Sequence, residues 1–212
     1  MAKRKNRELT RKSPKREAYK TVLIVCEGQK TEKLYFENLI LKEKLSSVNI
    51  KVYSGNNSDP KSVVETAIQK REEQRQYLDF DEVFCVIDRD NHSTFNEAQK
   101  LAKVNNIQLI VSYPSFEYWY LCHFIASRAP IIGTGSKSAG DMCVDLLNIH
   151  WKKTFNEIYK KARPGIYTIL LPYLNTAKKN AMNALIDSEI NNEPNPSTRV
   201  HLLVENLINI RN

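Results

Sequence analysis

The sequence predicts an α/β protein: a parallel sheet of about four strands with flanking helices, followed by a helical C-terminal region. Short apolar runs at 21–26, 48–53, 82–87 and 107–112 are typical of buried strands. Helical spacing separates these runs, and strands that alternate with helices form parallel sheets through right-handed crossovers. Beyond residue 113 the apolar spacing is helical, and no further strand is expected.

The elements follow one another in a regular order. Helices between the strands are expected at 29–44, 61–76 and 94–105. The second of them follows a turn-rich segment, in which Ser58 or Asp59 is expected to cap the helix and Pro60 to occupy its first turn. Five more helices are expected, at 115–126, 138–151, 154–162, 174–190 and 197–210. This pattern divides the chain into a basic tail (1–20), an α/β domain (21–125) and a helical region packed on it (126–212).

The positive charge of the chain is concentrated at its start. Residues 1–20 contain nine Lys or Arg and two Glu, so this tail carries +7 of the formal net charge of +8. Such a segment is too polar to fold alone, and it is predicted to be disordered. It could bind nucleic-acid phosphates in a salt-dependent way, or it could be a solubilising arm. The candidate contacts are Lys3, Arg4, Lys5, Arg11, Lys12, Lys15 and Arg16, with Lys152 from the helical region.

Composition excludes several protein classes. No stretch approaches the roughly 20 apolar residues that span a bilayer, and the basic N-terminus lacks the apolar core of a secretory signal. We therefore expect a cytoplasmic protein with no membrane contact. The scattered cysteines form no CxxC pair and are expected to be buried apolar residues: Cys26, Cys85, Cys122 and Cys143. No complete Walker A loop is present, so ATP binding of that kind is not expected.

Three carboxylates stand at the ends of two predicted strands. Glu27 follows the run 21–26, and Asp88 and Asp90 follow the run 82–87. The carboxyl ends of parallel strands meet at one edge of a sheet, where ligands bind in open α/β folds. Carboxylates that converge there would repel one another without a cation, and oxygen ligands suit Mg²⁺ or Mn²⁺. An acidic turn with no further role is the plain alternative for Asp88 and Asp90.

Two further acids lie near the same edge. Glu117 follows the fourth predicted strand after a short turn, so it is a candidate metal ligand, although it could instead favour the dipole of its helix. Glu32 lies one turn into the first helix, and a helix-capping role is favoured for it over a place in the metal cluster. The aromatic residues 116 and 118–120 are expected to belong to the core.

Four segments carry the most distinctive residue patterns. They are Val-Cys-Glu-Gly-Gln-Lys-Thr-Glu at 25–32 with Tyr35-Phe36, Asp-Arg-Asp at 88–90, Tyr-Pro-Ser-Phe-Glu-Tyr-Trp at 113–119, and Asn-Pro-Ser-Thr at 195–198. Together they resemble the RloB-like family, related to the AbiL phage-defence component, over nearly the whole chain. A Glu after the first strand and an Asp-x-Asp after the third also resemble the layout of the Toprim catalytic domain, so the expected sheet is Toprim-like.

The resemblance implies a metal-dependent nuclease in anti-phage defence. Glu27, Asp88 and Asp90 would be catalytic and would bind Mg²⁺ or Mn²⁺, with Glu117 as a further ligand. Lys153 is our candidate for a catalytic lysine, because the resemblance includes the Lys-Lys-Thr of residues 152–154. The substrate would be DNA or RNA, including transfer RNA, and a separate ATPase subunit is the implied partner. The oligomeric state stays open, and a homo-oligomer is compatible with the sequence.

Two other functions remain open at this point. The chain could be a non-catalytic subunit that binds nucleic acid or the partner and holds a structural metal. It could also be a phosphatase that acts on a small phosphate, which would not need the basic tail.

Overall fold

The sheet of this chain has five strands in the order β2-β1-β3-β4-β5. The computed structural model describes residues 20–46, 49–55, 59–89 and 93–210. The strands are β1 (Val22–Cys26), β2 (Ile50–Ser54), β3 (Glu82–Asp88), β4 (Gln108–Tyr113) and β5 (Ser197–Thr198). The first four pair in parallel, and β5 pairs antiparallel with β4. The expected α/β fold with a mostly parallel sheet is confirmed, with one strand more than the sequence indicated.

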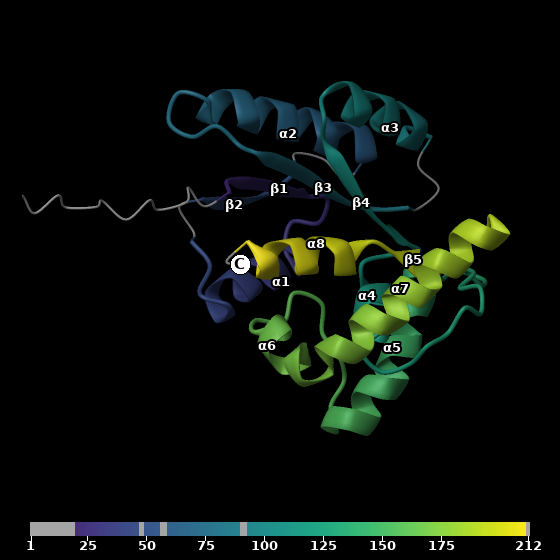
Figure 1. Cartoon of the computed structure of the whole chain (residues 1–212). Coiled ribbons are helices and arrows are strands. Elements are labelled where there is room, and N and C mark those ends of the chain that lie inside the picture. Colours follow the sequence, from purple (N-terminus) through teal and green to yellow (C-terminus); the bar gives the residue numbers. More distant parts are fainter. Residues whose placement is uncertain (1–19, 47–48, 56–58, 90–92, 211–212) are drawn as a thin grey trace, which may run out of the picture.

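Helices cover both faces of the sheet. The helices α2 (Pro60–Gln74) and α3 (Phe95–Val104) lie on one face, and α1 (Thr31–Lys42) and α8 (Val200–Asn209) lie on the other (Figure 1). Alternate residues of each strand point to opposite faces. Leu23 of β1 therefore packs in the core beneath α2 and α3, whereas Ile24 packs in the core with α1 and α8. Burial on both faces explains why the strands are continuously apolar.

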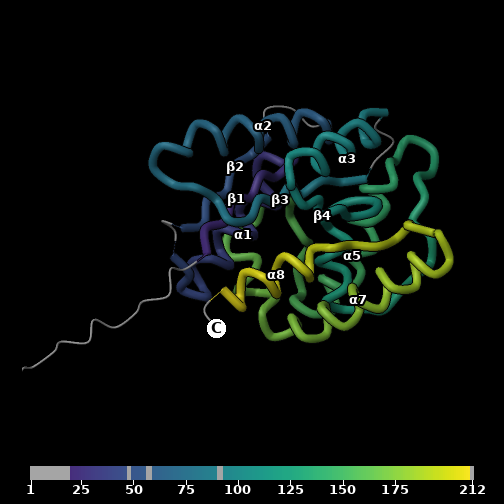
Figure 2. The backbone as a smooth tube through the Cα atoms, turned by 45° about the horizontal axis from the view of Figure 1, so that its top comes forward, coloured from purple at the N-terminus to yellow at the C-terminus, as the bar shows by residue number. Residues whose placement is uncertain are grey.

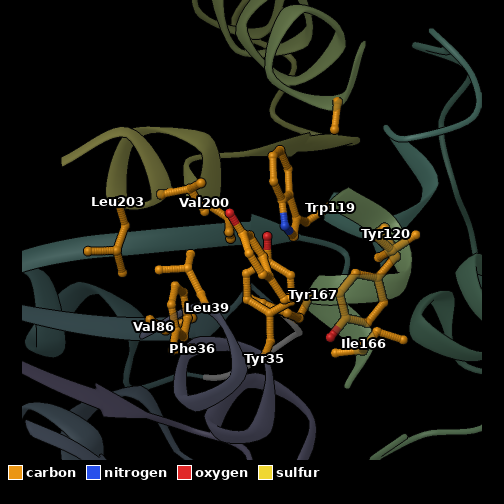
Figure 3. Packing of buried hydrophobic residues seen from close by; sticks show 14 of the residues in the cluster. Tyr35, Phe36, Leu39, Val86, Trp119, Tyr120, Ile166, Tyr167, Val200 and Leu203 are labelled. Atoms are coloured by element: carbon orange, nitrogen blue, oxygen red, sulfur yellow. The ribbon is translucent and has the colours of Figure 1, made fainter. Parts of the chain in front are cut away.

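The C-terminal helices share their core with the α1 face of the sheet. They are α4 (Glu117–Leu121), α5 (Ala139–Phe155), α6 (Ile166–Leu170) with the 3-10 turn η1 (Leu171–Tyr173), and α7 (Leu174–Asn191). In Figure 3, Tyr35 of α1, Trp119 of α4 and Tyr167 of α6 point toward one another, and Leu203 of α8 lies farther along the same cluster. A single apolar cluster thus joins the sheet to the helical region, and Figure 2 shows α8 returning along the sheet.

Local chemistry explains where several helices begin and end. Asp59 caps α2 by accepting the backbone N–H of Ser62 at 3.1 Å, and Pro60 follows it, as the sequence predicts. Ser138 and Asp141 form a reciprocal capping box at the start of α5. The prediction of a separate helix at 154–162 is wrong, because α5 continues to Phe155 and ends there, where Asn156 adopts a left-handed conformation with φ of 57°.

The segment 195–198 closes one edge of the sheet. The hydroxyls of Thr198 and Ser112 are hydrogen-bonded at 2.8 Å, and Arg199 N–H donates to the Val111 carbonyl at 3.0 Å. Asn195 exchanges two hydrogen bonds with the backbone of Ile131. The helix predicted at 197–210 therefore begins only at Val200, after a short strand.

Two general expectations concern the whole chain. All four cysteines are buried, as expected, and their thiols are free. Within the described ranges, none of the helices has the length and apolar character needed to cross a membrane.

Candidate active site

Glu27 and Asp88 lie side by side at the carboxyl edge of the sheet. The backbone N–H of Glu27 donates to the Val86 carbonyl at 2.9 Å, which extends the pairing of β1 with β3. The Glu27 carboxylate then accepts the backbone N–H of Asp88 at 3.0 Å. This bond holds Glu27 against the end of β3, so two of the three strand-end carboxylates meet. Asp90 lies outside the described residues.

Glu32 joins the same group of carboxylates, so its favoured assignment to helix capping is wrong. The start of α1 has no side-chain cap. The Glu32 side chain is instead buried, and its Oε2 has no hydrogen-bond partner among the described residues. Gly28 makes room for it, because a Cβ at that position would overlap the Glu32 carboxylate. The glycine after Glu27 therefore allows the Glu32 side chain to lie close to the backbone at position 28.

Glu117 reaches the cluster from α4. Its side chain is buried, and its Oε2 accepts the Ser115 hydroxyl at 2.8 Å. Its Oε1 lies 3.7 Å from the ammonium nitrogen of Lys161. The short turn between β4 and α4 thus brings Glu117 to the carboxyl edge of the sheet, where the sequence predicts it.

The four carboxylates interact strongly through their charges. Burial raises the pKa of Asp88 well above its usual value, and the negative charges of Glu32, Glu117 and Glu27 raise it further. A backbone hydrogen bond from Phe116 opposes these effects. Although the Asp88 residue keeps some exposure, its surroundings disfavour the charged carboxylate. The cluster is therefore stabilised by a proton or by a bound cation.

The chemistry of this cluster fits a divalent cation. All its donors are carboxylate oxygens, the ligands that Mg²⁺ and Mn²⁺ prefer, and the buried Oε2 of Glu32 lacks a partner among the described residues. Within those same residues, no three His, Cys, Asp or Glu side chains form a ready-made metal site. The expected ligand set also includes Asp90, which lies outside them. We conclude that Glu27, Glu32, Asp88 and Glu117 suit a metal by their chemistry.

The buried Glu32 should make the metal-free protein less stable at high pH. Burial raises the pKa of Glu32 from 4.5 to about 7, with the Glu117 charge adding to it and Lys161 and a backbone hydrogen bond opposing it. A raised folded-state pKa means that the contribution to stability is complete below pH 4.5 and is lost as the pH rises through 7. As the pH rises across this range, the free energy of unfolding of the Glu32→Gln variant should therefore increase relative to that of the wild type, by roughly 3 kcal/mol at pH 8.

Urea unfolding with a chelator at pH 5 and pH 8 measures this difference. Glu37→Gln is the matched control, because Glu37 lies on the exposed side of α1 and pairs only loosely with Lys33 at 3.8 Å. Stability curves for Glu32→Gln and the wild type that stay parallel from pH 5 to 8 would contradict the prediction.

Lys161, rather than the predicted Lys153, lies close to a carboxylate of the cluster. Lys153 lies exposed in the last turn of α5 and forms no ion pair with any described carboxylate. Lys152, the expected nucleic-acid contact from the helical region, is exposed beside it. After the left-handed Asn156 the chain turns back, and this turn brings Lys161 to Glu117.

The aromatic and tail residues that the sequence singles out lie outside the carboxylate cluster or outside the described residues. The aromatic residues Phe116, Tyr118, Trp119 and Tyr120 are buried, which confirms that they belong to the core. The tail candidates, from Lys3 to Arg16, lie outside the described residues. Glu32 and Lys161 are therefore the site residues that sequence reasoning underrated. The glycine four residues before Glu32 was the available signal, and for Lys161 the sequence offered only its place in a basic run.

Comparison with known proteins places the chain in one family. The family model described as "RloB-like protein" matches residues 22–207, which includes all described carboxylates of the cluster. Searches of curated proteins and of solved structures gave no match. Because the match extends over most of the sequence, the chain belongs to the RloB-like family.

Proposed function

We propose that this chain is a metal-dependent nuclease that hydrolyses phosphodiester bonds of DNA or RNA in anti-phage defence. Membership of the RloB-like family fits a role related to phage defence or restriction. The observation that carries the proposal is the meeting of Glu27, Glu32, Asp88 and Glu117 at one sheet edge, with the pKa of Asp88 raised by burial and by the other three charges. Carboxylate clusters of this kind hold the cations used in phosphate chemistry.

Each residue has a role in this proposal. Asp88 and Asp90 would hold Mg²⁺ or Mn²⁺ with Glu27 and Glu117, and the cation would polarise the phosphate and lower the pKa of water. The Asp88 N–H donates to the Glu27 carboxylate and orients it, which supports a role for Glu27 in accepting or returning a proton. Lys161 adds a positive charge near Glu117, where it would stabilise charge that develops on the phosphate.

The wider assembly follows from the same proposal. The basic tail, with a net charge of +7, would hold the nucleic acid through its phosphates. The resemblance to the AbiL phage-defence component implies a separate ATPase subunit, and we propose that this subunit controls the activity. The lack of a complete Walker A loop in this sequence fits that division of labour. Transfer RNA is among the substrates to be screened.

Binding of Mn²⁺ is the first experiment, because it does not require the partner. Calorimetry on the full chain should show specific Mn²⁺ binding, and the Asp88→Ala, Asp90→Ala double variant should lose it. The Asp79→Ala, Asp81→Ala variant is a control that loses the same charge just before the opposite end of β3. Because the Asp81 carboxylate accepts a hydrogen bond from the Thr21 hydroxyl, the folding of this variant must be checked.

The outcomes separate the functional alternatives. Loss of binding in the double variant alone supports the metal site and justifies cleavage screens. Absence of specific binding in the wild type contradicts an autonomous metallo-nuclease and equally a subunit with its own structural metal, and it favours a site that only a partner or the substrate phosphate completes.

A further inference from the structure

A groove lies on the opposite face of the sheet from the carboxylate cluster. It has a volume of about 580 Å³ and runs between α3, the β4–β5 edge and the C-terminal end of α7. Leu109, Val111 and Tyr113 of β4 line it, and they point away from the α1 face. Its volume falls within the range of about 300–1,000 Å³ typical of small-ligand sites, which would accommodate one nucleotide.

Arg89 brings a positive charge into this groove. Its guanidinium carbon lies 4.8 Å from the centre of the Phe95 ring and 5.8 Å from that of Tyr113. Arg89 is exposed, and it forms no ion pair with a carboxylate in the described part of the chain. The two rings orient the planar guanidinium through cation–π contacts and leave its N–H donors available.

A second guanidinium lines the same groove. Arg199 pairs with Glu189 at 3.0 Å, and both side chains are about half exposed. Exposed pairs of this kind are weak, so Arg199 can exchange its carboxylate partner for a phosphate at little cost. Among the described residues, the charged groups that line the groove are Arg89, Arg199 and Glu189, which gives this part of the lining a net positive charge.

The rest of the lining suits a base and a sugar. Leu109, Val111 and the Tyr113 ring provide an apolar wall against which a base can stack. Gln99 and Asn192 provide amide donors and acceptors at the opposite sides. Guanidinium groups, an aromatic ring and amides together match a nucleotide better than they match an apolar ligand or a bare anion.

The groove is joined to the carboxylate cluster through a single peptide bond. Asp88 ends β3 and faces Glu32 and Glu117, whereas Arg89 faces Phe95 and Tyr113 on the other side. Their Cα atoms are about 3.8 Å apart, as in any trans peptide. A strand that crosses the end of β3 can therefore contact both places at once.

We propose that the groove binds one nucleotide of a single-stranded substrate, next to the phosphodiester held at the carboxylates. Arg89 and Arg199 bind its phosphate, and its base stacks on Tyr113. This inference rests on the proposed nuclease function for the identity of the substrate, because the groove itself indicates only a nucleotide.

Binding of a short oligonucleotide tests the groove separately from catalysis. The full chain is titrated into fluorescein-labelled single-stranded trinucleotides of DNA and of RNA, in EDTA and about 150 mM salt, and anisotropy gives the dissociation constant. Arg89→Gln should raise that constant about tenfold, Tyr113→Leu by a similar factor, and Arg89→Lys by less. The tail is identical in all variants, so the differences report the groove.

Arg75→Gln is the matched control, because Arg75 is an exposed arginine just after α2 that pairs with Glu72 at 3.3 Å. It should bind as the wild type does. Thermal unfolding of each variant excludes loss of fold as the cause.

Three results are informative in different ways. Tenfold weaker binding by Arg89→Gln, with Arg75→Gln unchanged, supports the groove. Wild-type affinity in both Arg89→Gln and Tyr113→Leu overturns it and leaves the carboxylate site untouched. Weakened binding by Arg89→Gln together with no cleavage by the wild type in Mn²⁺ supports the groove and contradicts an autonomous nuclease.

Discussion

Replacing Asp88 with Asn should abolish phosphodiester hydrolysis and at the same time make the metal-free protein more stable. Hydrolysis should fall by about 1,000-fold or more, because a ligand of the proposed cation and its negative charge are both lost. Stability should rise because burial and three neighbouring carboxylates disfavour the charged Asp88 in the folded state. A charged carboxylate that made net favourable contacts in the folded protein would show the opposite stability effect.

Single-turnover cleavage of labelled single- and double-stranded DNA and RNA, with Mg²⁺ or Mn²⁺, measures the first effect. Thermal unfolding in EDTA at pH 8 measures the second. Asp79→Asn is the matched control, because Asp79 is exposed between α2 and β3, at the other edge of the sheet. Full activity of Asp88→Asn would rule out its catalytic role, and a lower unfolding temperature would contradict the electrostatic argument.

The largest loss of stability is expected from Trp119→Ala, at about 3–5 kcal/mol. Trp119 is fully buried, and its ring centre lies 6.5 Å from that of Tyr35 in α1 and 4.8 Å from that of His123. Removing it leaves a cavity where the sheet side of the core meets the helical region. Because one apolar cluster spans both, unfolding should remain a single transition.

Urea unfolding followed by circular dichroism and by tryptophan fluorescence checks this prediction. Tyr77→Ala serves as the control, since the Tyr77 side chain is 85% exposed, and it should change the free energy of unfolding by less than about 0.5 kcal/mol. Two separate transitions would show that the helical region folds independently of the sheet.

Sequence periodicity was sufficient to predict the regular part of the fold, the parallel strands that alternate with helices. The four parallel strands are continuous apolar runs because both their faces are buried, and this signal placed Glu27 and Asp88 at one edge. β5 has only two residues, so it carries no periodic signal, and its position depends on the Ser112–Thr198 hydrogen bond. Alternation along a strand cannot reveal a contact between hydroxyls that are 86 residues apart.

The candidate site was predictable only in part for a similar reason. Residues at strand ends are located by topology, whereas Glu32 and Lys161 are located by tertiary packing. Glu32 enters the cluster because Gly28 lacks a side chain, and Lys161 enters because the chain reverses at Asn156. Neither event has a spacing that distinguishes it from an ordinary polar helix or a basic run.

The closure of the sheet by residues 197–198 has a consequence for synthesis of the protein. Until these residues and α8 have left the ribosome, the outer edge of β4 is unpaired, and the face of the sheet that includes Ile110 lacks its α8 cover. An uncovered edge strand and an exposed apolar face favour association between chains. A nascent or prematurely terminated chain that ends before residue 197 is therefore expected to aggregate or to be degraded, and it would lack Arg199 as well.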